Sequence, residues 1–245
     1  MHRIWGLLVA ALLAAALLAG VPGSAAAADG FSMRDRFARE TSRYGDRDAS
    51  TYAIQHVREL QYRLKREGLL RGVSATGYYG EATRAAVRTF QRRVGVRVSG
   101  VATHATWREL LERSNHNLSV ARRRCAGAGW HVCYDRAQHQ VTLWRGGRLW
   151  NSWLVRGGAY DSKTRRGNFT VYWRSKDHVS SLYGSPMPYS QFFSGGQALH
   201  GSRAMMDPFV GHSHGCVNMY VEDARQLWKL TSQQRLRVHV YAAWD

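Results

Sequence analysis

Residues 213–219 read Ser-His-Gly-Cys-Val-Asn-Met, and this stretch organises the interpretation of the whole chain. It places a thiol, Cys216, beside a compact glycine and a histidine, His214. A second histidine, His200, lies upstream in the sequence Leu-His-Gly-Ser at 199–202. Because a thiol attacks well only as the thiolate, a reactive cysteine needs a nearby base or cation. The sequence therefore predicts that Cys216 is a nucleophile and that His200 takes its proton.

Two other interpretations use the same residues. Four side chains here could bind zinc: His200, His212, His214 and Cys216. The His-x-His-x-Cys spacing matches none of the structural zinc motifs, and no glutamate stands nearby to act as a base. A buried cysteine with hydrogen-bonded histidines is the other alternative, but it does not explain why they gather between Gly211 and Gly215. A glycine at 215 would let the amides of Gly215 and Cys216 point at a developing oxyanion.

The composition indicates a folded and strongly basic chain. Its 245 residues leave room for two modest domains, and nine tryptophans with 44% hydrophobic residues are enough for real cores. Lys and Arg number 35 against 17 Asp and Glu, which gives a net charge of +18. Such a charge attracts nucleic acid, acidic lipid headgroups or the anionic polymers of a cell wall.

The N-terminus predicts export. Met1-His2-Arg3 is basic, an Ala/Leu-rich run extends from Ile4 to about Leu18, and small residues follow over Ala25–Ala28. This order is typical of a secretory signal peptide over 1–28, with an uncleaved anchor helix as the alternative. Either way the remainder lies outside the cytoplasm, which argues against nucleic acid as a partner. After cleavage we expect no contact with the membrane.

The chain has three cysteines. Cys125 and Cys133 flank a flexible Ala-Gly-Ala-Gly segment, whereas Cys216 is isolated. Because an exported protein can keep a disulfide, we expect Cys125 and Cys133 to be paired and Cys216 to be free. Two unpaired buried thiols are the alternative.

The first half of the chain predicts a small three-helix domain over 50–113, preceded by a polar linker over 29–49. Ser50 or Thr51 can cap a helix that carries an apolar stripe to Leu64 and ends at Gly68. A second helix opens near Thr83 and ends at Gly95, and a shorter third one carries Trp107. A turn-and-cap pattern occurs twice, as Gly-x-x-Gly-x-x-Thr at 77–83 and Gly-x-x-Thr-x-x-Thr at 100–106.

These residues resemble the bacterial type 1 peptidoglycan-binding domain. The resemblance covers roughly 51–111 and rests on Leu60-Gln61, on the pattern from Gly80 to Gln91, and on the turn at 100–106. The family often has Asp-Gly where this chain has Thr76-Gly77 and Ser99-Gly100. The resemblance implies a module that binds peptidoglycan glycan or peptides, and the positive charge also allows binding to anionic wall polymers.

The second half changes to a twofold period after a basic connector over 114–129. Strands are predicted at 130–134, 140–144, 149–155, 168–173, 198–201 and 237–241, with one helix carrying Val221, Ala224 and Leu227. Residues 175–191 are predicted to form an irregular loop, a lid or a binding wall that contains Tyr189. The expected fold class is therefore multidomain α+β: a helical module followed by a mainly β domain over 130–245.

The motif Ser-His-Gly-Cys-Val-Asn at 213–218, preceded by His200-Gly201, is similar to the signature of L,D-transpeptidase catalytic domains of the YkuD type. The resemblance covers roughly 130–241. Val-Arg-Gly-Gly at 155–158 also fits, whereas Thr-Arg-Arg-Gly at 164–167 lacks the proline that members usually have.

The resemblance implies a mechanism without a metal or an organic cofactor. Cys216 attacks the third residue of a peptidoglycan stem tetrapeptide and expels D-alanine, and an amine acceptor then forms a 3→3 cross-link. With water as the acceptor the enzyme would be a carboxypeptidase. The implied catalytic set is Cys216, His200, Gly201, whose carbonyl orients His200, and the supporting His214, Ser213 and Gly215; the substrate-contact candidates are Asn218, Tyr189 and Ser202. The rival functions are a zinc-dependent peptidoglycan amidase or peptidase and a non-catalytic wall-binding protein.

Overall fold

The computed structural model describes residues 32–243. The predicted signal peptide and its alternative, an anchor helix, lie outside these residues. The helices are α1 (Val57–Arg66), α2 (Glu81–Val94), α3 (His104–Arg113), α4 (Leu118–Arg124), the 3₁₀ turn η1 (Tyr160–Ser162) and α5 (Val221–Thr231). The strands are β1 (Trp130–Asp135), β2 (Gln140–Arg145), β3 (Arg148–Leu154), β4 (Gly167–Thr170), β5 (Trp173–Val179), β6 (Pro186–Ser194), β7 (Gln197–Gly201), β8 (Val217–Met219) and β9 (Leu236–Tyr241). Within the described part of the chain, no helix combines the length and the apolar character needed to cross a bilayer.

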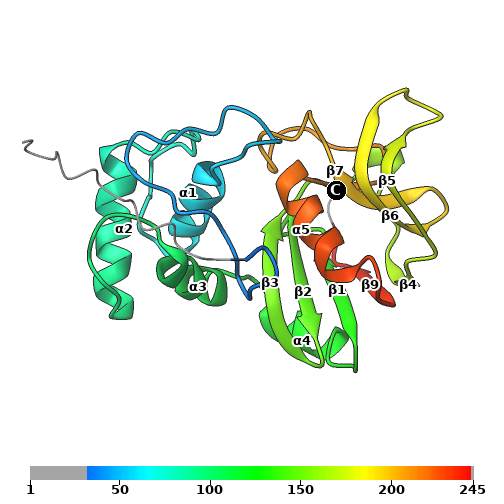
Figure 1. The fold of residues 1–245 in the computed structure, drawn as a ribbon, viewed down its shortest axis with the longest axis horizontal. Helices are drawn as coiled ribbons and strands as arrows, with labels where there is room; N and C mark the ends of the chain where they lie inside the picture. The colour runs from blue at the N-terminus through cyan, green and yellow to red at the C-terminus, as the bar shows by residue number, and fades with distance from the viewer. Residues whose placement is uncertain (1–31, 244–245) are drawn as a thin grey trace, which may run out of the picture. The chain divides into compact units, whose positions relative to one another are not determined.

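The strands form two mixed sheets, so the predicted α+β class is confirmed (Figure 1). The first sheet has the order β3-β2-β1-β9-β4 and the second has the order β5-β6-β7-β8. Helix α5 contacts both: Trp153 of β3 donates from Nε1 to Gln226 at 3.1 Å, and the helix packs on β6 and β7. The largest core of this half contains residues from both sheets and from α5, including Val132, Trp153, Leu199, Val217 and Leu227.

The three predicted helices of the first half pack around a common core that includes Leu60, Phe90 and Trp107. Two buried glutamines explain the repeated turn pattern. Gln61 accepts from the Gly77 amide and donates to Thr83 Oγ1, and Gln91 makes the same two contacts to Gly100 and Thr106. Both glycines have φ values above +70°, a conformation that costs a glycine little.

The first helix begins later than predicted. It starts at Val57, after a left-handed His56, and the Asp48 carboxylate accepts from its first amides, those of Val57 at 3.1 Å and Arg58 at 2.7 Å. Thr51 instead accepts from the Val221 amide at 2.9 Å, and Ile54 packs with Met205 and Tyr220. The apolar period included Ile54 because a residue buried by a tertiary contact cannot be distinguished, in the sequence, from one on the helix face.

Two further segments differ from the predictions. The irregular loop predicted over 175–191 is a β-hairpin, in which Asp177 pairs with Pro188 and Ser175 with Ser190. Strand β5 is an edge strand without a buried side chain, so it has no apolar alternation to detect. The predicted connector contains α4, which packs through Ala121 into the helical core. Cys125 and Cys133 are joined by a disulfide, and Cys216 is a free thiol.

The polar segment before the helices is packed and does not behave as a linker. Phe37 is fully buried and donates its amide to Trp150 of β3 at 3.0 Å, and Ser42 pairs with Ala102. Arg39 is 2% exposed and hydrogen-bonds both to Glu59 of α1 and to the Ser152 carbonyl of β3. The charges that predicted a linker are therefore used in buried ion pairs.

A second buried ion cluster joins this segment to α5. His56 lies between Glu40, 2.7 Å from Nδ1, and Asp223 of α5, 2.9 Å from Nε2. Burial alone would lower the pKa of His56, but the attraction of Asp223 and Glu40 outweighs it and raises the pKa well above its usual range. Burial likewise opposes ionisation of Glu40, but His56 outweighs it and lowers the pKa of Glu40 to about 2.

We expect His56→Gln to destabilise the chain by about 3 kcal/mol at pH 6, because two carboxylates lose their cation. A raised histidine pKa stabilises the fold fully below about pH 6.5 and less as the pH rises through the folded pKa. The stability gap between wild type and variant should therefore shrink above that folded pKa. Thermal unfolding followed by circular dichroism between pH 5 and pH 10 measures it. His104→Gln is the matched control, since His104 bonds to the Arg36 carbonyl; a gap that is the same at every pH would contradict the expectation.

Candidate active site

Two parallel strands bring the predicted base and nucleophile to one face of the second sheet. Strand β7 carries His200, and β8 begins directly after Cys216. Leu199 is paired with Val217, and His200 with Asn218. Leu199 and Val217 point into the core. Because side chains alternate along a strand, His200, Asn218 and Cys216 lie on the opposite face.

The Cys216 thiol is half-buried in an apolar environment. Its sulfur packs beside Met187, Phe192 and Ala198, and the Ala198 amide donates to Sγ at 3.4 Å. Burial raises the pKa of the thiol above its usual range, and the Ala198 hydrogen bond only partly offsets this. The resting state is therefore the protonated thiol, which needs a base to become a nucleophile.

His200 has the protonation state of a base. Its Nδ1–H donates to the Gly201 carbonyl at 2.8 Å, so Nε2 is the ring nitrogen without a proton. Burial, with a smaller contribution from nearby His178, lowers the pKa of His200 to about 4, although hydrogen bonds to Gly201 and to the Asn218 side chain oppose the shift. The imidazole is therefore neutral at neutral pH. Among the described residues, Cys216 Sγ accepts from the Ala198 amide and donates to the Gly196 carbonyl, and it makes no hydrogen bond to His200.

Ser213 and two glycines shape the turn before Cys216. Ser213 Oγ donates to the Cys216 carbonyl at 2.5 Å and accepts from the Gly215 amide at 3.1 Å. The Gly215 amide was predicted to face an oxyanion, but in this structure it donates to Ser213 Oγ. Gly215 has a φ of +116°, and a Cβ on Gly158 would lie 2.6 Å from the Gly215 amide nitrogen. The backbone of the turn therefore packs directly against the backbone of residues 157–158, and only glycine fits at 158.

Gln197, which belongs to no predicted motif, hydrogen-bonds a third segment to the site. Its Nε2 donates to the Lys163 carbonyl at 3.0 Å, and its Oε1 accepts from the Arg165 amide at 2.9 Å. Thr164 Oγ1 accepts from the Gly158 amide at 3.0 Å. These bonds hold the 164–167 segment that lacks the usual proline. The only sequence signal for Gln197 was its position directly before the predicted strand at 198–201.

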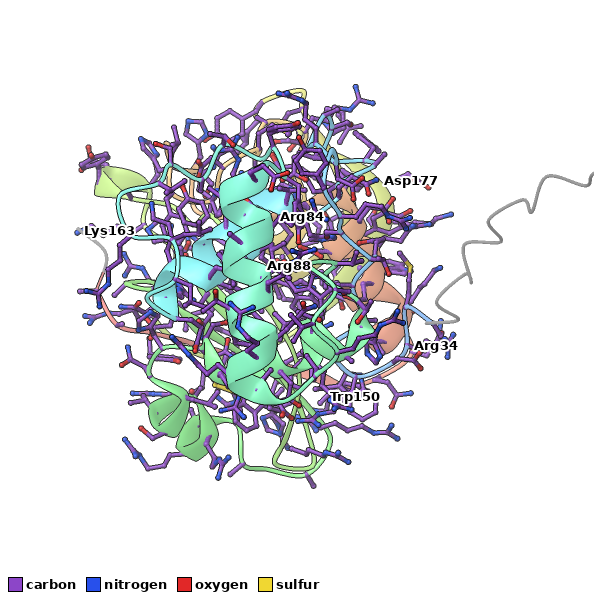
Figure 2. All side chains as sticks on the ribbon, turned by 90° about the vertical axis from the view of Figure 1, so that its left-hand side faces the viewer. Arg34, Arg84, Arg88, Trp150, Lys163 and Asp177 are labelled. Atoms are coloured by element: carbon purple, nitrogen blue, oxygen red, sulfur yellow. A yellow bond between two sulfur atoms is a disulfide. The ribbon has the colours of Figure 1, made fainter. Side chains whose placement is uncertain are left out.

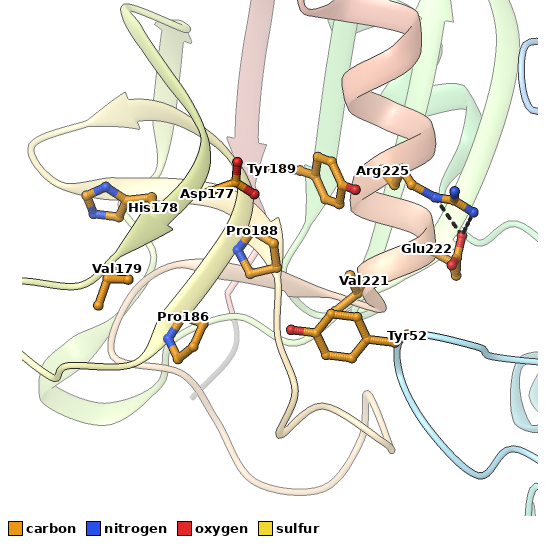
Figure 3. A pocket seen from close by; sticks show the side chains of 10 residues that line it. All are labelled: Tyr52, Asp177, His178, Val179, Pro186, Pro188, Tyr189, Val221, Glu222 and Arg225. Atoms are coloured by element: carbon orange, nitrogen blue, oxygen red, sulfur yellow. Dashed lines mark hydrogen bonds and ion pairs between the residues drawn. The ribbon is translucent and has the colours of Figure 1, made fainter.

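The other predicted residues have different surroundings. His214 is exposed and stacks on Tyr183 of the β5–β6 turn, with ring centroids 4.4 Å apart. Ser202 donates its amide to the Met219 carbonyl and accepts from the Ala204 amide, so it stabilises the start of the following loop. Tyr189 packs on Trp228 of α5 and lines a hollow of about 310 Å³ with Tyr52 and Pro188 (Figure 3). Cys216 is not among the residues that line this hollow.

The side chains that lie close enough together to bind a metal ion are outside the Cys216 site. Within residues 32–243, ligand atoms within 4.8 Å of one another occur in two groups: Cys125, His131 and His239, and His56, Glu59 and Asp223. Cys125 is in the disulfide, and the acids of the second group are engaged by His56, Arg39 and Arg63. Neither group contains His200, His212, His214 or Cys216, so the predicted zinc alternative has no converging ligand set at this site.

Comparison with known proteins agrees with the fold and the motif. Residues 129–240 match the family of L,D-transpeptidase catalytic domains (YkuD), and residues 55–110 match the putative peptidoglycan binding domain. The fold is similar to an L,D-transpeptidase of Stackebrandtia nassauensis (TM-score 0.51, 24% identity, covering 82% of this chain and 97% of that chain). An L,D-transpeptidase of Xylanimonas cellulosilytica aligns with a TM-score of 0.45, 26% identity and coverage of 83% and 98%. No curated protein matches the chain.

The second half of the molecule is therefore an L,D-transpeptidase catalytic domain. The chain is thus an L,D-transpeptidase with a YkuD-type catalytic domain over 129–240 and a putative peptidoglycan binding domain over 55–110 in front of it.

Proposed function

We propose that this L,D-transpeptidase is an exported enzyme that uses Cys216 to form 3→3 cross-links in peptidoglycan. The observation that carries the proposal is the pairing of β7 with β8, which puts His200 on the same face as Cys216, with Nε2 as its unprotonated nitrogen. Export rests on the signal-peptide pattern of residues 1–28. Peptidoglycan as the partner is supported by both family matches.

The first half of the reaction follows from the two protonation states. The Cys216 thiol is protonated and His200 is neutral, so His200 Nε2 takes the proton as Sγ bonds to the carbonyl carbon of the third stem residue. The resulting tetrahedral intermediate collapses to a thioester when the bond to the D-alanine nitrogen breaks. His200 then gives its proton to that leaving amine. The Gly201 carbonyl holds the imidazole in the required tautomer throughout.

In the second half an amine replaces the sulfur. A side-chain amine of a neighbouring stem attacks the thioester carbonyl, His200 takes a proton from that amine, and the thiol is regenerated. With water as the acceptor the same steps give a shortened tripeptide.

The helical module is proposed to keep the enzyme on its polymeric substrate, which raises the local substrate concentration without altering the chemistry. Its α2 helix carries Arg84 and Arg88 on its outer side (Figure 2). Arg88, Arg92 and Arg93 are exposed, which supports additional attraction to anionic wall polymers.

Incubation of the full chain with defined muropeptides, followed by mass spectrometry of the products, tests the proposal. We expect tetrapeptide donors to lose D-alanine and to form dimers linked through their third residues, and a chelator should leave this activity unchanged. Activity lost on chelation and restored by zinc would instead establish the metal-dependent amidase. Wall binding without turnover would establish the non-catalytic alternative.

A further inference from the structure

The loop over residues 202–212 joins the strand that carries His200 to the turn that carries Cys216. The catalytic domain holds this loop from one side. The guanidinium of Arg156 donates to the Ala204 carbonyl at 3.2 Å and to the Val210 carbonyl at 2.8 Å. His139 donates from Nδ1 to the Pro208 carbonyl at 2.9 Å. Because the loop leads directly into the turn at 213–216, its position affects the position of Cys216.

Helix α1 of the helical module holds the same loop from the other side. Tyr62 donates its hydroxyl to the Asp207 carboxylate at 3.0 Å, and Arg58 Nη1 lies 3.1 Å from Asp207 Oδ2. The ring of Tyr62 packs against Phe209, with centroids 4.5 Å apart. Asp207 also accepts from the Phe209 amide at 2.9 Å, so one carboxylate joins the helix to the backbone of the loop.

The side chains that make these contacts are largely buried and are held by further hydrogen bonds. The side chains of Arg58 and Asp207 are only 20% and 16% exposed. Arg58 is itself held by the Ala75 and Thr76 carbonyls, so its guanidinium is pre-positioned for the carboxylate. Burial and the charge of Asp207 raise the pKa of Tyr62 to about 12, which keeps the hydroxyl a donor at every physiological pH.

We propose that Arg58 and Tyr62 are positioning residues for Cys216, acting through Asp207 and the 202–212 loop. The helical module is then a structural part of the active site as well as a wall anchor, and a ligand that shifts α1 would alter the reactivity of the thiol. This inference rests on the proposed cysteine chemistry. It follows from the contacts because an error of about 1 Å in the placement of a reacting group can cost on the order of a hundredfold in rate.

The chain offers a matched control on the same helix. Arg66 of α1 also contacts the catalytic domain, donating to Gln140 Oε1 at 2.7 Å and to the Gln138 carbonyl at 2.9 Å. Neither acceptor belongs to the 202–212 loop. Arg66→Met therefore weakens the docking of α1 without releasing Asp207, whereas Tyr62→Phe and Asp207→Asn release the loop and keep side-chain size.

The test measures acylation of the full chain by a carbapenem, using stopped-flow absorbance at increasing carbapenem concentration. We expect Tyr62→Phe and Asp207→Asn each to lower the maximal acylation rate about tenfold with little change in the half-saturating concentration. Arg66→Met should stay within about twofold of wild type. In the double variant Tyr62→Phe/Asp207→Asn the two losses should not multiply, because they break one contact. Melting temperatures show that each variant is folded.

The possible failures are distinguishable. If the wild type is acylated and the Tyr62 and Asp207 variants react as fast, the positioning role is wrong while the proposed function stands. An equal loss in Arg66→Met, or multiplicative losses in the double variant, would also overturn it in favour of general domain docking. If the wild type forms no adduct, the proposed function fails and this inference fails with it.

Discussion

Cys216→Ala is expected to abolish acylation: the wild type should gain the mass of one carbapenem, and the variant should gain none. The same variant should release no D-alanine from a tetrapeptide, a loss on the order of a thousandfold or more. The physical reason is that Cys216 is the one free thiol among residues 32–243. Cys125 and Cys133 are in the disulfide and cannot react. Intact-protein mass spectrometry makes the measurement.

Cys216→Ser serves as the control for this prediction, because it keeps the shape of the side chain and replaces sulfur with a weaker nucleophile. It should fold as the wild type does and be acylated far more slowly. An adduct of equal yield on Cys216→Ala would show that another residue is acylated and would contradict the role of Cys216.

His200→Ala is expected to slow acylation by about 10²- to 10⁴-fold without unfolding the chain, since the protonated thiol loses its general base. In the wild type the rate should fall as the pH drops toward 4, because a protonated His200 cannot accept the proton. Above that pH the base is neutral, so the rate should stay on a plateau through pH 7. In His200→Ala the rate should instead rise with pH as the thiolate forms. Rates measured by stopped flow from pH 3.5 to 9 separate these profiles.

His178→Gln is the matched variant. Its ring lies near His200 and lowers the pKa of that imidazole. Removal of His178 keeps the base, so the plateau rate should persist while the acidic limb moves to higher pH. Acylation kinetics of His200→Ala that equal those of the wild type would remove His200 as the base.

Most regular elements could be predicted from apolar periodicity. The helices that bear Leu60, Phe90 and Trp107 each bury one face, and strands β1, β2, β3 and β9 of the first sheet alternate or bury both faces. Strand β5 could not be predicted, because an exposed edge strand buries no side chain. The packed segment around Arg39 could not be predicted either, since its burial depends on carboxylates and carbonyls that are distant in sequence.

The residues of the candidate site likewise differ in whether the sequence predicts them. Residues 213–218 form a contiguous motif, so the sequence alone identifies Cys216 as the candidate nucleophile and supplies its neighbours. Gln197, Thr164 and Asp207 have no such signature. Each acts through hydrogen bonds to another segment, and such partners have no periodic or local trace in the sequence. Tyr189 was predicted from its place in a binding wall, and its contact with Trp228 of α5 likewise has no sequence signal.

The two modules, the α+β class and the identity of the thiol and its candidate base could be predicted from sequence, because they depend on local pattern and residue chemistry. The protonation state of that base depends on tertiary packing. The pKa of His200 is low because the fold buries it, and its lone pair is on Nε2 because the Gly201 carbonyl engages Nδ1. The tertiary structure also decided that helix α1 holds the loop before Cys216, since a contact between Tyr62 and Asp207 exists only once both modules are packed together.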